Sequence, residues 1–104
     1  MEIRAEIKQV FDGTKPTKAI ADVIIDNSVV IHGVRLIEKD DGRFISMPYD
    51  KWTDKNGEEK RRDIAHPISS TARRQIQDAV SAAFDKHAEE RAEEYLREEV
   101  IENV

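Results

Sequence analysis

Asp63 and His66, in the segment RDIAHPI at residues 62–68, are the side chains of this sequence whose types and spacing could serve acid–base chemistry. Catalysis would also need a nucleophile or a substrate pocket. The sequence has no cysteine, no nucleophile elbow and no glycine loop that cradles phosphate. Residues three positions apart on a strand also point to opposite faces. We therefore expect no enzyme activity and no small-molecule substrate.

The same segment is better explained as a junction between a strand and a helix. Pro67 favours extended geometry at the preceding residue, His66, which ends the strand and directs the chain into the helix. Asp63 is then expected to pair with Arg35, with Arg62 or with a backbone N–H group near this junction.

The histidines could also be metal ligands. His32 and His66 have no ligand-spacing motif, and the lack of cysteine excludes thiolate sites. We interpret both as hydrogen-bonded core imidazoles. His87 falls on a helical apolar stripe, where we expect half-buried packing. The sequence predicts neither a metal nor a cofactor.

Basic and aromatic side chains gather between Met47 and the expected helix, and they are candidates for nucleic-acid binding. Residues 51–74 carry seven bases against four acids. Lysine and arginine can contact phosphates, and flat aromatic rings can stack on bases. The predicted contact residues are Lys51, Lys55, Lys60, Arg61 and Arg62, a second row of Arg73 and Arg74, and the aromatics Tyr49 and Trp52.

Simpler explanations of this cluster stay open. Cations in a glycine-containing loop are ordinary solvated surface, and Glu58 and Glu59 are near enough to neutralise them. The aromatics could fold back over a sheet edge. Arg73 and Arg74, however, would oppose the dipole at the helix N-terminus and cost stability there, which favours a use in binding.

Composition fits a single small domain. The chain has 104 residues, of which 38% are apolar, and it has no apolar run near the roughly 20 residues of a membrane span. Together with the lack of cysteine, this predicts a cytoplasmic protein without a membrane partner. Residues 85–104 hold eight acids and three bases, which account for the whole net charge of −5.

Hydrophobic periodicity predicts the elements that must position these residues. Ile3, Ala5 and Ile7 alternate with charged residues, as in a strand with one solvated face. Further strands are expected at residues 18–26, 29–38, 44–47 and 61–65, with a turn at Asp41-Gly42 and a polar loop over residues 48–60.

After Pro67 the apolar period becomes helical. Ser69 or Ser70 is a good N-cap, and the helix is expected to continue to about residue 99. Such a helix would be longer than the domain is wide, so its acidic end should kink, fray or lie on another surface. The predicted fold is α+β, an antiparallel β-sheet of about five strands followed by a C-terminal α-helix.

The two central strands favour a homodimer formed through the sheet. Residues 18–26 and 29–38 have aliphatic side chains at both odd and even positions. Both faces of these strands should therefore be covered, and one helix can cover only one of them.

Four blocks of the sequence resemble, in order, the family of stage V sporulation protein G (SpoVG) of bacteria. The blocks are Val30-Ile31-His32 with Val34-Arg35, then Gly42-Arg43-Phe44-Ile45-Ser46-Met47-Pro48, then Arg62-Asp63-Ile64-Ala65-His66-Pro67-Ile68, then Ile76-Gln77-Asp78-Ala79-Val80. One departure is that family members carry bases directly after Met-Pro, whereas this chain has Tyr49-Asp50-Lys51-Trp52.

The resemblance covers residues 1–84, a domain that includes the start of the helix, and leaves residues 85–104 outside it as an acidic helical tail. It implies an α+β domain that dimerises through its sheet. It also implies a regulator of gene expression that binds nucleic acid and is connected with sporulation and septation.

Two functions therefore stay open. The first is a nucleic-acid-binding regulator, with DNA and also RNA as candidate ligands. The second is a protein-interaction module that does not bind nucleic acid directly, in which the positive segment is incidental. A steep salt dependence of nucleic-acid binding is required only by the first.

Overall fold

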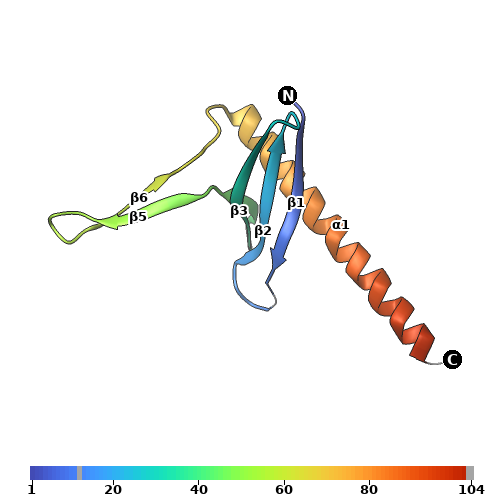
Figure 1. Cartoon of the computed structure of the whole chain (residues 1–104). Coiled ribbons are helices and arrows are strands. Elements are labelled where there is room, and N and C mark those ends of the chain that lie inside the picture. Colours follow the sequence, from blue (N-terminus) through green and yellow to red (C-terminus); the bar gives the residue numbers. More distant parts are fainter. Residues whose placement is uncertain (12, 103–104) are drawn as a thin grey trace.

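The computed structural model describes residues 1–11 and 13–102, which form six strands followed by one helix. The first four strands make an antiparallel sheet in the order β1-β2-β3-β4, and the last two pair with each other (Figure 1). The elements are β1 (Ile3–Val10), β2 (Thr17–Ile25), β3 (Val29–Lys39), β4 (Gly42–Ser46), β5 (Tyr49–Thr53), β6 (Glu59–Asp63) and α1 (Ser70–Glu102). The predicted α+β class is confirmed, with six strands in two sheets where about five in one sheet were expected.

The polar loop predicted over residues 48–60 is wrong. Residues 49–53 and 59–63 are strands β5 and β6, which pair along their whole length from Tyr49 opposite Asp63 to Thr53 opposite Glu59. The closing strand predicted at residues 61–65 is β6, and it pairs with β5 instead of joining the main sheet. Both strands are largely exposed, so they lack the one-sided apolar alternation by which a strand is recognised in a sequence.

β3 changes its side-chain alternation at a β-bulge. Ile31 pairs with Val23 of β2. Val34 pairs with Ala21, so two residues of β3 stand opposite one residue of β2. The second of these two is Gly33, whose φ of 80° suits glycine best. The bulge lets Ile31 and Val34 face the core together although they are an odd number of positions apart, so apolar residues at both parities do not by themselves require two covered faces.

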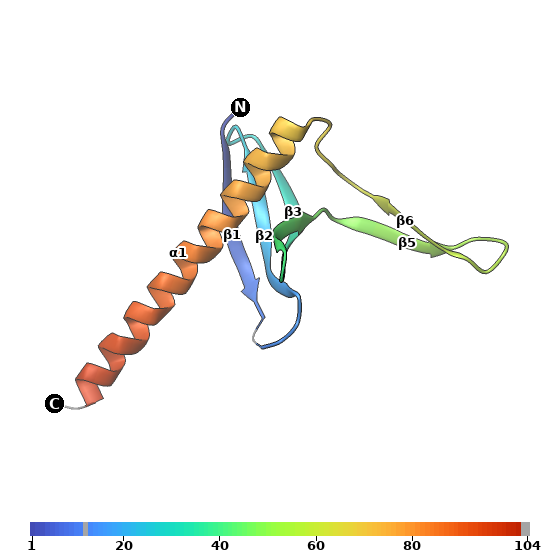
Figure 2. The ribbon, with the colours of Figure 1, turned by 180° about the vertical axis from the view of Figure 1, so that it is seen from behind.

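α1 covers one face of the sheet and completes the core. Figure 2 shows it crossing this face diagonally beside β1. The Ser69 hydroxyl oxygen accepts a hydrogen bond from the Ala72 N–H at 3.1 Å, which confirms the predicted cap. The buried core consists of Ala19, Ala21, Val23, Val34, Leu36, Ile45, Met47, Ile76 and Val80.

Arg43 joins β4 to the middle of α1. Its guanidinium donates hydrogen bonds to the Ser81 hydroxyl and the Asp85 carboxylate, both at 2.9 Å, and to Glu38 at 3.1 Å. It also lies 5.3 Å from the centroid of the Phe84 ring. The hydrogen bond to Asp85 is the main cause that raises the pKa of Arg43, and Glu38 adds to it. This network holds the helix in place on the sheet.

The C-terminal half of α1 projects beyond the sheet (Figure 1). The helix has 33 residues and is about 50 Å long at 1.5 Å per residue. It continues to Glu102, slightly beyond the expected end near residue 99, and the side chains of residues 88–97 are exposed, so this stretch does not lie on another surface of the described chain. Asn103 and Val104 of the predicted acidic tail lie outside the described residues. Within the described part of the chain, no helix is both long and apolar enough to cross a membrane.

Candidate nucleic-acid interface

β5, β6 and the turn between them form a hairpin, residues 49–63, which we call the arm. The arm extends away from the main sheet and contacts no other strand or helix of the described chain (Figure 1). At its tip the Asp54 N–H donates to the Glu58 carbonyl oxygen at 2.9 Å, and Gly57 has a φ of 80°. The Asp54 carboxylate accepts two more backbone N–H bonds, at 2.9 and 3.0 Å. The arm is therefore an ordered hairpin closed by a three-residue turn.

One face of the arm carries Tyr49 next to two cations. Lys51 is opposite Arg61 in the strand register, and Tyr49 comes two residues before Lys51, so the three side chains point to one face. The Arg61 guanidinium lies 4.0 Å from the centroid of the Tyr49 ring, and the Lys51 ammonium lies 5.8 Å from it. Both are cation–π contacts.

The other face carries Trp52 in a similar setting. Trp52 is opposite Lys60, and Arg62, two residues farther along β6, lies 5.9 Å from the centroid of the indole ring. The Trp52 residue is 46% exposed. Trp52 therefore does not fold back over the sheet edge, whereas Tyr49 is half-buried at the base of the arm. Each face of the arm presents a ring with nearby positive charge.

Charges within the arm are unevenly distributed. The arm has five bases and five acids, so its formal charge is zero. Lys60 forms ion pairs with Glu58 at 3.1 Å and with Asp54 at 3.8 Å, near the tip. Lys51, Arg61 and Arg62 form no ion pair within the described part of the chain. Of the four arm bases without an ion pair among the described residues, Lys51, Arg61 and Arg62 therefore lie in the half of the arm nearest the sheet, around the two rings, and Lys55 lies at the tip.

The remaining predicted contact residues lie apart from this half. Lys55 is in the exposed turn at the tip. Arg73 and Arg74 are exposed in the first turns of α1, which makes no contact with the arm. The structure thus brings together Tyr49 with Lys51 and Arg61, and Trp52 with Lys60 and Arg62.

Asp63 and His66 do not form a pair. Asp63 makes no side-chain hydrogen bond or ion pair with any residue that the structure describes, and the His66 Nδ1 lies 3.1 Å from the carbonyl oxygen of Pro67. The expected pairing of Asp63 with Arg35 or Arg62 is wrong. β6 does not join the sheet that holds Arg35, and Arg62 alternates to the opposite face of the arm.

The expectation of core imidazoles is also wrong. His32 and His66 are both exposed, and His32 Nδ1 lies 3.0 Å from a carboxylate oxygen of Asp22 on the neighbouring strand. The described residues contain no group of three or more His, Cys, Asp or Glu side chains that could hold a metal ion.

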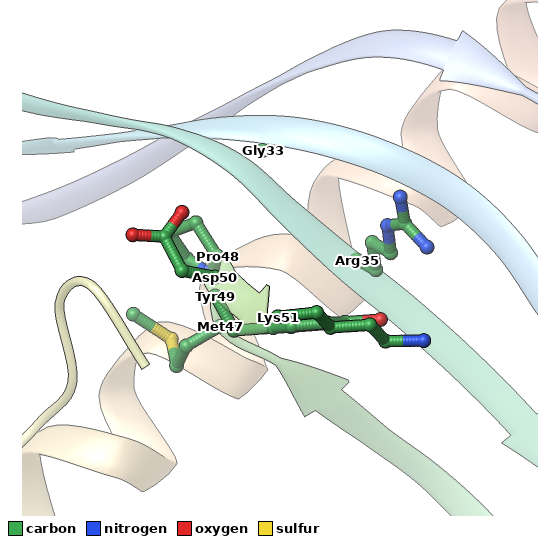
Figure 3. A pocket seen from close by; sticks show the side chains of 7 residues that line it. All are labelled: Gly33, Arg35, Met47, Pro48, Tyr49, Asp50 and Lys51. Atoms are coloured by element: carbon green, nitrogen blue, oxygen red, sulfur yellow. The ribbon is translucent and has the colours of Figure 1, made fainter. Parts of the chain in front are cut away.

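A cleft of about 510 Å³ lies where the arm leaves the sheet. It is lined by Gly33 and Arg35 of β3, by the Met47-Pro48 connection and by the first residues of β5 (Figure 3). Sequence reasoning named Tyr49 and Lys51 but missed the two residues of β3. Nothing in the local sequence around Gly33 or Arg35 shows that the start of β5 lies beside them.

Comparison with known proteins shows the family. The SpoVG family model matches residues 1–86. The chain belongs to the SpoVG family. A relative from Brevibacillus brevis named "Putative septation protein SpoVG" is 47% identical over 73 residues, which cover 70% of this chain and 73% of the relative. One of the same name from Desulforudis audaxviator is 43% identical over 79 residues, 76% of this chain and 84% of the relative. "Putative septation protein SpoVG 2" of Listeria monocytogenes is 40% identical over 82 residues, 79% of this chain and 76% of the relative.

The SpoVG match includes the main sheet, the arm and the first half of α1. It ends at residue 86, shortly before residues 88–97, where all the helix side chains are exposed. The resemblance read from the four sequence blocks is therefore confirmed, and the acidic helical projection begins where the family match ends.

Proposed function

We propose that this SpoVG-family protein binds nucleic acid through the arm and thereby regulates gene expression. One observation carries the proposal: the arm contacts no other strand or helix among the described residues and presents an aromatic ring with nearby cations on each of its two faces. Proteins that bind nucleic acid with little sequence preference combine positive charge for the phosphates with aromatic rings for the bases.

The arrangement favours a particular division of roles. Lys51, Arg61 and Arg62 would contact phosphates, because they have no ion-pair partners among the described residues. Tyr49 and Trp52 would offer ring faces to unpaired bases. Lys60 would contribute less, because Glu58 and Asp54 already neutralise it. DNA and RNA are both candidate ligands, since phosphates and base rings are common to them.

The cellular role that we propose follows the names of the relatives, which refer to septation, and that of the family, which refers to sporulation. In this proposal the protein acts in the cytoplasm as a homodimer, without catalytic activity. The dimer would display two arms, and two linked contacts bind more tightly than one.

A charge-neutralised arm tests the proposal. We compare the unmodified protein with a Lys51→Gln, Arg61→Gln, Arg62→Gln triple variant, using fluorescence anisotropy of labelled DNA and RNA between about 50 and 200 mM salt. The triple variant should bind more weakly and should lose roughly one unit of salt slope for each phosphate contact removed. Trp52 is the only tryptophan, so quenching of its fluorescence reports on the arm directly.

A matched control removes the same charge elsewhere. Lys15, Lys39 and Lys86 are exposed and outside the arm, and their triple change to glutamine should leave the salt slope nearly unchanged.

Trp52→Ala should weaken single-strand binding more than duplex binding, because only unpaired bases can stack on the ring. The proposal is contradicted if the unmodified protein binds neither DNA nor RNA near about 50 mM salt, or if the two triple variants behave alike.

The alternative is a protein-interaction module, and one observation favours it. The projecting half of α1 exposes Tyr95 and Leu96 among acidic side chains. Exposed apolar side chains with polar neighbours are typical of surfaces that bind another protein. If nucleic acid is retained only weakly and without salt dependence, this alternative replaces the proposed function.

A further inference from the structure

We propose that the cleft at the base of the arm is a subsite for one nucleotide of single-stranded nucleic acid, whose phosphate lies between Arg35 of β3 and Lys51 of β5. The inference rests on the proposed function. It extends the binding surface from the arm onto the main sheet and adds a contact residue, Arg35, that lies outside the basic segment.

The size and position of the cleft support this assignment. Its volume of about 510 Å³ falls within the roughly 300–1,000 Å³ of small-ligand sites. It opens beside the part of the arm where the available cations are concentrated, and Tyr49 contributes to both the cleft and one face of the arm. A nucleic-acid strand bound along the arm and running toward the main sheet would therefore reach the cleft next.

The charges around the cleft favour a phosphate at one side of it. Figure 3 shows the charged ends of Arg35 and Lys51 on the same side, and the Asp50 carboxylate on the other. Within the described residues, neither Arg35 nor Lys51 has a carboxylate at ion-pair distance. An anion would thus be attracted to the two cations and repelled by Asp50, which would orient the nucleotide in the cleft.

The β3 bulge shapes the wall of the cleft. A bulge locally interrupts the hydrogen-bonded ladder, and Gly33 contributes no side chain to the space. A Cβ atom at this position would lie 3.9 Å from the Cβ of Pro48, so any larger side chain would begin to fill the gap between β3 and the arm. The bulge also helps to place Arg35 on the face away from α1, because Val34 and Leu36 on either side of it are buried in the core.

A single strand is the class of nucleic acid that fits. A nucleotide can occupy a cleft of this size only if its base is free of the double-helical stack, because a paired base must first be extruded at a cost in free energy. Duplex could still contact the cations of the arm, but it would gain nothing from Arg35.

The test compares Arg35→Gln with Lys39→Gln, a variant with the same loss of charge on the same strand outside the cleft. Both are titrated against labelled oligo-dT and oligo-U of about ten nucleotides and against a duplex, at about 50 and 200 mM salt. Arg35→Gln should weaken single-strand binding roughly three- to tenfold and lower the salt slope by about 0.7 unit. Lys39→Gln should change the affinity less than about twofold, and duplex binding should respond alike to both variants.

An NMR titration of the unmodified protein with oligo-dT provides a second readout that no folding defect can imitate. The amide signals of Gly33 and Arg35 should shift together with those of the arm. The inference is overturned if the arm signals shift while Gly33 does not, or if Arg35→Gln binds like Lys39→Gln although the arm triple variant is weakened. An unmodified protein that bound neither oligonucleotide would instead overturn the proposed function.

Discussion

Arg43 and Asp63 show how differently two charged side chains of the same fold are used. Arg43 donates to three partners on β3 and α1 and is only partly exposed, with 27% of its side-chain surface accessible. Asp63 is half-buried at the base of the arm but has no side-chain partner in the described part of the chain. A charged side chain stabilises the fold through the hydrogen bonds that it makes with partly buried partners. Replacement of Arg43 and of Asp63 should therefore change the free energy of unfolding by different amounts.

Arg43→Ala should lower the free energy of unfolding by about 1.5–3 kcal/mol, because it removes hydrogen bonds between charged groups that join the sheet to the helix. Asp63→Ala is the comparison and should change it by less than about 0.5 kcal/mol, instead of the larger cost expected for a buried polar partner. Urea denaturation followed by circular dichroism measures both. Equal losses for the two variants would mean that Asp63 has a structural role that its surroundings do not explain.

Two elements project from the body of the protein, and they carry different charges. The arm and the C-terminal half of α1 extend in opposite directions in both views (Figures 1 and 2). The half of the arm nearest the sheet has available cations, whereas residues 88–104 hold seven acids and two bases. Exposed carboxylates repel a polyanion only within about a Debye length, so the helix should oppose the binding of nucleic acid that is long enough to extend from the arm toward it.

Truncation after His87 should therefore raise the affinity for nucleic acid long enough to reach the helix, by roughly two- to tenfold at about 50 mM salt and by less at about 200 mM, and should hardly change the affinity for an oligonucleotide confined to the arm. The fold should persist, because the side chains of residues 88–97 are exposed. Replacement of Glu89, Glu90, Glu93 and Glu94 by glutamine in the full chain separates charge from length. Anisotropy titrations would contradict this prediction if both variants bound more weakly than the unmodified protein.

At the scale of the whole molecule, one face of the main sheet has no covering layer among the residues that the structure describes. α1 packs on one face only. The other presents paired aliphatic and aromatic residues beside polar ones, which are Arg35 and the ion-paired Arg4, Glu6, Lys8, Asp22 and His32. Ile24 is opposite Val30, and Ile37 is opposite Phe44, so each pair points to one side. Val30 and Phe44 are 43% and 38% exposed. Such a face is typical of sheets that pack against a second layer.

We expect a homodimer formed through the apolar pairs of this face, with Arg35, which lies on the same face, left accessible at the base of the arm. Light scattering at micromolar concentration should return about twice the chain mass of 12.0 kDa, and a Val30→Asp, Phe44→Asp double variant should return a monomer with an intact helix signal. Lys86→Gln, an exposed position on α1 outside this face, is the control that should stay dimeric. A monomer mass for the unmodified protein would contradict the expectation.

The local sequence was sufficient for much of the fold. The alternation in β1, the N-cap at Ser69 and the helical spacing of Ile76 and Val80 each depend on residues within one or two turns of one another. Such patterns survive in any tertiary setting, because they arise from the periods of strand and helix. The four blocks that resemble the SpoVG family are local in the same sense.

The arm and the cleft were decided only by the tertiary structure. A strand is predicted from apolar residues that alternate on one buried face. Neither strand of the arm has such a face, so their charged sequence predicted a loop. The sequence shows that the arm contains basic residues, but it does not show which of them form ion pairs. Only the structure shows that Lys60 is paired, whereas Lys51, Arg61 and Arg62 are available near the rings. The site at Gly33 and Arg35 exists because the register of β3 with β2 and β4 brings a bulge beside the start of β5. That register is set by core packing over long sequence separations, which no local pattern contains.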